Sequence, residues 1–195
     1  MDTTSLGANL RVYTDRLEAN GIKFGQGIYL AGGAIRRAIC GHKIEEGDFD
    51  IYITNNWKFE EAQKAYGWEL VGSKERPTLK MMSYDFNIDN LRVQLHYLPA
   101  EMTLQSILET FDFTCCQFAY DGDKVHYLST ALEDTRNMRL RLTGTFSRFT
   151  VARSFRFLGM GFGATKSVLE ELQKRAAAEV LSPAAVAEET KKGFS

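Results

Sequence analysis

The stretch YLAGGAIRRAICGHKIEEGDFDIYI, from Tyr29 to Ile53, joins an apolar run, a glycine pair, a helical segment and a strand that carries two aspartates. The alternation in DFDIYI predicts a strand with Asp48 and Asp50 on one face and apolar residues on the other. Alone, a glycine pair is more often a tight turn, and a DxD pair is more often a solvated strand edge. Here the glycine pair and the DxD pair occur together, in the order strand, glycine pair, helix, DxD strand, and Asp48 lies 15 positions after Gly33. This combination predicts a ligand site.

The residue types of this stretch suit phosphate and metal chemistry. A glycine pair before a helix lets the backbone approach a ligand, so Gly32 and Gly33 are expected to present amides to a triphosphate, with Arg36 nearby. Aspartates at i and i+2 on a strand lie ~7 Å apart and can hold Mg²⁺ (or Mn²⁺) between them. Nucleotidyl transfer uses such ions to activate a hydroxyl and to neutralise the departing pyrophosphate.

Periodicity and turn signals along the rest of the chain predict an α+β fold, a mixed sheet flanked by helices. Helices are predicted over residues 6–20, 34–40, 57–66, 103–110, 146–160 and 166–180, and strands over 28–31, 49–53, 68–71, 79–84 and 91–98, with a hairpin that turns at 121–123. From Ser129 onward the chain is expected to be helical, with a short last helix that begins at Ser182-Pro183. We therefore expect two parts, a head over residues 1–138 and a helical neck and tail over residues 139–195.

Composition bounds the class of protein. At 195 residues the chain can bury one hydrophobic core, and three cysteines, an odd number, suit free thiols in a reducing compartment. We expect a soluble, cytoplasmic protein without a membrane segment, because no apolar run approaches ~18 residues. Residues 1–135 carry 13 Lys or Arg against 20 Asp or Glu, whereas 136–195 carry 11 against 5. The basic part is either a solvated surface or a contact for phosphate or RNA.

The stretch resembles the head of class II CCA-adding enzymes and bacterial poly(A) polymerases, members of the polymerase β superfamily, in which GGxVRD leads a helix and DxD follows. FDFTCCQFAYD (111–121) is similar to the family segment RRDFTINALAYD, and Leu132-Glu133-Asp134 stands where the family has GLEDL. ARSFRFLGMGF (152–162) is similar to the neck segment LRALRFAARLGF if one residue is deleted. The resemblance spans roughly 28–162 and implies a polymerase β-like nucleotidyltransferase head followed by a helical neck.

The matched positions imply roles for individual residues. Asp48 and Asp50 would be the catalytic residues that hold the metal, and Asp112 would accept from the ribose hydroxyls. Arg153 and Arg156, both matched in the neck, are expected to contact nucleotide or acceptor. On a helix that began at residue 146 they would share one side with Arg148, which would mainly guide the acceptor electrostatically.

Several positions depart from the family. Arg37 stands where the family has an acidic residue, Phe111 where it has an arginine, and Cys116 where it has an asparagine. The base-selecting motif EDxxR has no counterpart in 146–150. Where other superfamily members carry a third carboxylate on a later strand, RVQLHYL offers Gln94 and His96.

Two classes of function follow. The first is a template-independent nucleotidyltransferase that transfers a nucleoside monophosphate from an NTP to a hydroxyl, expected to be an RNA 3′ end. The second is a catalytically silent nucleotide- or RNA-binding module, to which the lost family positions point. Modification of a protein hydroxyl would use the same chemistry. Family members continue into a body and tail that hold tRNA, so we expect a homo-oligomer or a partner protein to hold the acceptor here.

Overall fold

The computed structural model describes residues 1–4, 7–76, 80–147 and 149–178. In chain order the elements are β1 (Asp2–Thr4), α1 (Ala8–Ala19), β2 (Ile28–Ala31), α2 (Gly33–Cys40), β3 (Phe49–Ile53), α3 (Phe59–Tyr66), β4 (Glu69–Arg76), β5 (Met81–Ile88), β6 (Leu91–Tyr97), α4 (Leu104–Glu109), the 3₁₀ turn η2 (Thr114–Cys116), β7 (Phe118–Tyr120), β8 (Val125–Tyr127), α5 (Ala131–Arg136), β9 (Arg139–Leu140), α6 (Thr150–Gly159), β10 (Gly163–Ala164) and α7 (Lys166–Ala178). The α+β fold expected from the sequence is confirmed.

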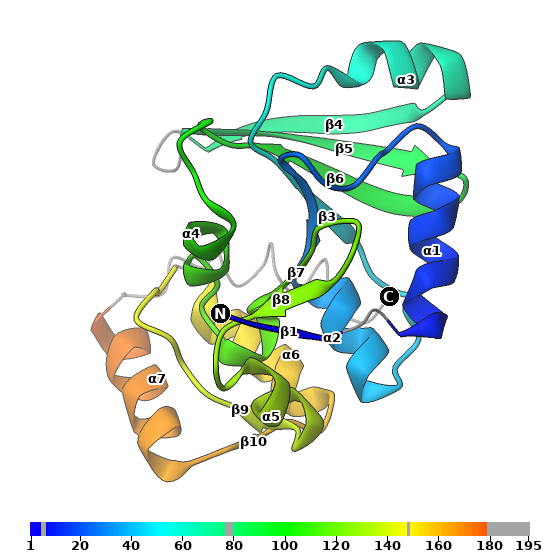
Figure 1. The fold of residues 1–195 in the computed structure, drawn as a ribbon. Helices are drawn as coiled ribbons and strands as arrows, with labels where there is room; N and C mark the ends of the chain where they lie inside the picture. Colours follow the sequence, from blue (N-terminus) through cyan, green and yellow to red (C-terminus); the bar gives the residue numbers. More distant parts are fainter. Residues whose placement is uncertain (5–6, 77–79, 148, 179–195) are drawn as a thin grey trace.

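The described residues form a mixed sheet of eight strands in the order β1-β8-β7-β2-β3-β6-β5-β4. At its centre, β3 pairs antiparallel with β2 and parallel with β6, and β4, β5 and β6 form an antiparallel meander. Figure 1 shows the meander and α3 at the top of the view, and α5, α6 and α7 gathered at the bottom. Residues 29–53 and 111–121, two of the segments that carry the family resemblance, lie next to each other because β2 pairs with β7.

The two faces of the sheet are covered differently. One face packs against α1, α2 and α3 in a core that includes Leu17, Ile35, Phe49 and Ile51, all at most 2 % exposed. The opposite face carries a smaller cluster around Ala31, with Leu108 of α4 and Ala119 of β7. Part of this second face is therefore left for a site.

The expectation that the chain is helical from residue 129 onward is wrong for the segment between α5 and α6. The Thr143 amide donates to the Asp112 carbonyl, and the Thr114 amide donates to the Arg141 carbonyl, so this segment runs extended beside residues 112–114. Helix α6 consequently begins at Thr150 instead of residue 146. The helix expected from Ser182-Pro183 lies outside the described residues.

Asp134 connects this extended segment to Thr114 through its buried carboxylate. Its carboxylate is fully buried, accepts from the Thr114 hydroxyl (2.6 Å) and pairs with the Arg141 guanidinium (Nε to Oδ2, 3.1 Å). The neighbouring Glu133 side chain is 61 % exposed and pairs with Arg139 at the surface. Buried charges need such partners, because an unpaired buried charge is costly. Among the described residues no helix has the length and apolar content needed to span a bilayer.

Replacing Asp134 with alanine should lower the free energy of unfolding by about 1–3 kcal/mol, because the buried Thr114 hydroxyl loses its acceptor. The matched variant Glu133→Ala, one residue away on the same first turn of α5, should change it by less than about 0.5 kcal/mol. Urea unfolding at pH 7 measures both. Equal losses would show that helix α5 itself, and not the Asp134 contacts, sets the cost.

Candidate active site

The carboxylates of Asp48 and Asp50 lie side by side on the open face of the sheet. Phe49 and Ile51 are fully buried on the other face, as the alternation predicts, whereas the Asp48 and Asp50 side chains are 40 % and 28 % exposed. Asp50 pairs in register with Ala31 of β2, the residue directly before the glycine pair. The strand pairing therefore brings the DxD segment next to the Gly32-Gly33 turn.

The two carboxylates have different electrostatic surroundings. Burial, and then the like charge of Asp50, raises the pKa of Asp48, although Arg92 (Nε to Oδ1, 3.3 Å) partly opposes the shift. Burial also pushes the pKa of Asp50 upward, but a hydrogen bond from His96 and the positive charges of His96 and Arg37 bring it below its ordinary value. Asp50 is thus the carboxylate that the protein holds ionised more firmly.

His96 contacts Asp50 and orients its carboxylate. Its ring is 3 % exposed, with Nε2 3.1 Å from Asp50 Oδ1 and Nδ1 2.8 Å from the Ser83 hydroxyl oxygen. A carboxylate only accepts, so Nε2 donates to Asp50, and in the neutral ring Nδ1 accepts from Ser83. The sequence pointed to His96 as the replacement for a third carboxylate. It gave no signal for Ser83, because the contact depends on the β5–β6 register that places Ser83 opposite His96.

The glycine turn has the geometry of a close approach, but one of its amides is already used. Gly32 has φ +74°, and a Cβ there would lie 2.9 Å from the Phe111 ring, so a side chain does not fit. Its amide donates to the Phe118 carbonyl (2.9 Å), so Gly32 shapes the turn and does not offer this N–H to a phosphate. The expected phosphate contact therefore passes to Gly33, at the start of α2.

The arginine of α2 that contacts the DxD segment is Arg37, which sequence reasoning did not select. Arg36 is 7 % exposed, with Nη1 3.3 Å from the Cys116 sulfur and its guanidinium 4.6 Å from the centre of the Phe157 ring. Arg37 Nη2 instead donates to the Asp48 carbonyl (2.8 Å). Spacing along α2 could not decide between the two, since neighbouring residues of a helix lie ~100° apart and both reach the turn.

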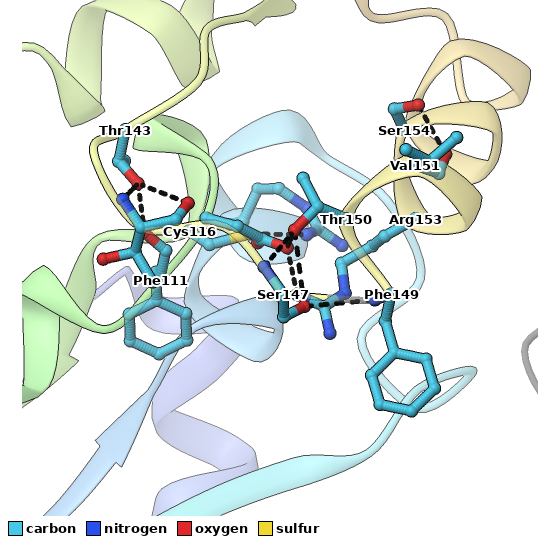
Figure 2. Close-up of polar contacts among 12 residues, drawn as sticks. Phe111, Cys116, Thr143, Ser147, Phe149, Thr150, Val151, Arg153 and Ser154 are labelled. Carbon is cyan, nitrogen blue, oxygen red and sulfur yellow. Dashed lines mark hydrogen bonds and ion pairs between the residues drawn. The ribbon is translucent and has the colours of Figure 1, made fainter. Parts of the chain in front are cut away.

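Asp112, expected to contact the ribose, is 2 % exposed and bonded to the neck helix. Its Oδ2 accepts from the Thr150 hydroxyl (2.9 Å) and from Arg153 Nη1 (2.5 Å). Figure 2 shows Thr150 and Arg153 on the first turns of α6, and Thr143 bonded to Phe111. The second oxygen, Oδ1, is buried and has no hydrogen-bond partner among the described residues. Asp112 and Arg153 therefore contact each other, and any contact of either with nucleotide stays a prediction.

The remaining neck arginines differ in position. Arg156 lies on the exposed side of α6, beside Phe155, which is 69 % exposed. Arg148 lies outside the described residues. The expected face shared with Arg148 therefore lies outside the described residues, and the roles expected of Arg153 and Arg156 stay predictions.

The residues on the open face fit a magnesium ion only in part. Carboxylate oxygens are the ligands that Mg²⁺ prefers, and Asp48 and Asp50 offer two carboxylates on one strand face. Within the described parts of the chain, no group of three or more His, Cys, Asp or Glu side chains is arranged to hold a metal. An ion here would take its other ligands from water or from substrate phosphates, as Mg²⁺ commonly does.

The comparisons with known proteins concern the family and the fold. A family model described as "Gabija anti-defense 2 family protein" matches residues 5–137. No curated protein sequence matches the chain. Solved structures that are similar include a Thermotoga maritima CCA-adding enzyme complexed with tRNA (TM-score 0.70, 21 % identity, 98 % of this chain and 50 % of that one). Others are a Bacillus stearothermophilus CCA-adding enzyme in complex with CTP (0.64, 17 %, 95 % and 48 %) and a tRNA-processing enzyme (0.66, 19 %, 97 % and 54 %).

These similarities show the fold: the resemblance to a CCA-adding nucleotidyltransferase head and neck is confirmed. The chain spans about half the length of the solved structures that it matches.

Replacing Asp50 with alanine should lower the free energy of unfolding at pH 7 by about 1–3 kcal/mol, because buried His96 loses its acceptor. Asp48→Ala should leave it unchanged or raise it, because it relieves repulsion between carboxylates. Since the folded-state pKa of Asp50 is lowered, its contribution is present at neutral pH and is lost as the pH falls through that pKa. Denaturant unfolding in EDTA at pH 7 and pH 3 measures this, and equal losses for both variants would contradict the assigned contacts.

Proposed function

The chain belongs to the Gabija anti-defense 2 family, and we propose that it is a template-independent nucleotidyltransferase, which transfers a nucleoside monophosphate from an NTP to a hydroxyl group. The observation that carries the proposal is the placement of Asp48 and Asp50 on one open strand face beside the Gly32-Gly33 turn. The fold of the similar solved structures supports it. We further propose that the acceptor is an RNA 3′ end and that this site holds Mg²⁺ or Mn²⁺.

Each residue has a part in the proposed reaction. Asp48 and Asp50 hold the divalent ion, which when bound activates the acceptor hydroxyl and offsets the charge of the leaving group. The Gly33 amide and the N-terminus of α2 bind the triphosphate. His96 keeps Asp50 ionised and oriented. The acceptor oxygen forms a bond to the α-phosphorus, the bond from that phosphorus to the bridging oxygen breaks, pyrophosphate leaves, and the hydroxyl proton passes to water.

A second function has its own supporting observation. Asp112 and Arg153, two residues that the family resemblance assigns to the nucleotide, are bonded to each other in this chain. A catalytically silent module that binds nucleotide or RNA would tolerate this contact. The family description refers to counteracting a defence system, which fits either an enzyme or a binding protein.

The experiment that separates these functions incubates the protein with Mg²⁺ or Mn²⁺, each α-³²P-labelled NTP in turn, and total RNA. Label in RNA supports the proposal, and label in the protein fraction would move the acceptor to a protein hydroxyl. NTP binding without label would favour the silent module.

Asp48→Asn and Asp50→Asn should each reduce label transfer by about a hundredfold or more, because metal-assisted charge stabilisation supplies several kcal/mol of the barrier reduction. The control is Asp89→Asn, the same chemical change in a surface ion pair with Arg16. It should leave transfer unchanged. If either site variant kept the parent rate while remaining folded, this metal site would not be the catalytic one.

Gly33→Val should weaken NTP binding at least about tenfold, because a side chain at the start of α2 occupies the space that the triphosphate needs. A Cβ there would already lie 3.2 Å from the Arg37 guanidinium. Gly163→Val in β10, where a Cβ meets nothing within 4 Å, is the matched control. Titration of a fluorescent NTP analogue measures both affinities, and normal affinity in Gly33→Val would leave this turn with a role in folding only.

A further inference from the structure

The guanidinium of Arg37 lies between the two backbone segments that define the site. An ideal Cβ on Gly47 would lie 2.1 Å from its Nη1 and 2.6 Å from its Nη2, and one on Gly33 would lie 3.2 Å from Nη1. Such a Cβ on Gly47 would overlap the guanidinium, so glycine at 47 leaves the room that Arg37 occupies. A triphosphate held between the start of α2 and Asp48 would meet this group.

The Arg37 guanidinium donates a hydrogen bond to the backbone of the DxD segment. Nη2 donates to the Asp48 carbonyl (2.8 Å), which fixes the group without using the negative charge of the Asp48 side chain. Nε is buried and has no hydrogen-bond partner among the described residues. A guanidinium group is cationic at neutral pH.

Arg37 has both cations and carboxylates around it. Arg36 and Arg92 are its cationic neighbours. Asp48 and Asp50 act on it as anions, and Asp85 acts electrostatically on Asp48. Guanidinium groups bind phosphate with strong, directed hydrogen bonds. The Arg37 guanidinium, whose buried Nε has no hydrogen-bond partner among the described residues, therefore suits a phosphate ligand.

Position 111, on the other side of the turn, supplies no charge. The Phe111 ring packs on the backbone of Gly32 and lies 6.0 Å from the Tyr52 ring, centroid to centroid. The turn thus has an aromatic wall on one side and the Arg37 cation on the other. A phosphate chain that leaves the turn has Arg37 as its nearest cationic neighbour on α2.

We propose that Arg37 binds the terminal phosphates of the substrate triphosphate, so that this site recognises a nucleoside triphosphate chiefly by its phosphate chain. The assignment rests on the proposed function and adds a residue to it. The ligand proposed for Arg37 is a linear polyphosphate, either free or as part of an NTP. A purely structural Arg37 would support Asp48 through the carbonyl contact and would not bind phosphate.

The test measures competition by inorganic tripolyphosphate against a fluorescent NTP analogue, with Mg²⁺ and in EDTA, for the parent, Arg37→Gln, Arg37→Lys and Arg16→Gln. Arg37→Gln keeps a donor for the Asp48 carbonyl but loses the charge, and should weaken tripolyphosphate binding about tenfold to a hundredfold. Arg37→Lys should retain most of the affinity. Arg16→Gln removes the same charge from a surface ion pair with Asp89 and should have no effect.

Gly47→Ala provides a second variant that leaves the charge in place. The added Cβ displaces the guanidinium, so tripolyphosphate affinity should fall as in Arg37→Gln. Mn²⁺ affinity without nucleotide, together with thermal unfolding, reports on Asp48 and on folding, and should change little in Arg37→Gln.

The outcomes separate this inference from the proposed function. If the parent transfers label and Arg37→Gln binds tripolyphosphate as tightly as Arg16→Gln does, the Arg37 assignment is overturned and the enzyme stands. If tripolyphosphate binding depends on Arg37 but no acceptor is labelled, the phosphate site stands and transfer fails. A parent that binds neither NTP nor tripolyphosphate overturns both.

Discussion

The pairing of β3 between β2 and β6 is the constraint on which the rest of the site depends. Phe49 and Ile51 must point into the core beneath α1 and α2, and the period of two then sends Asp48 and Asp50 to the opposite face. A slip of one residue would bury both carboxylates and expose the core residues. The same register sets Ala31 beside Asp50, so the glycine turn, helix α2 and Arg37 take their positions from it.

The sequence was informative where a pattern is local. The β3 strand, the glycine turn before α2 and the hairpin after Phe118 followed from alternation, glycine placement and turn residues, which act within a few positions. Contacts between distant segments carried no such signal. Ser83 contacts His96 because of the strand register, which the sequence does not specify locally. Residues 141–143 run extended because they form hydrogen bonds with the backbone at 112–114, and the residue types of 141–143 do not predict these bonds.

The charge asymmetry of the chain has a structural explanation in part. Arg139 and Arg141 pair with Asp134, and Arg153 pairs with Asp112, so three arginines of the basic segment neutralise acids of the head. These ion pairs join the neck to the head. The charges of their arginines are therefore already balanced by carboxylates of the protein. The count of basic residues in this segment therefore overstates the positive charge that is left for a ligand.

The composition of the site also bears on how a metal would be held in the proposed reaction. Asp48 shares its charge with Arg92, and Asp50 shares its charge with His96, which stands on the strand where a third carboxylate would add another negative charge. A carboxylate that already pairs with an arginine or accepts from an imidazole attracts a divalent ion less strongly than an unpaired carboxylate would. Mg²⁺ readily takes phosphate oxygens as ligands, so the substrate must bring part of the negative charge. In the proposed reaction, metal binding would thus be coupled to binding of the triphosphate, with Arg37 on the phosphate side of that coupling.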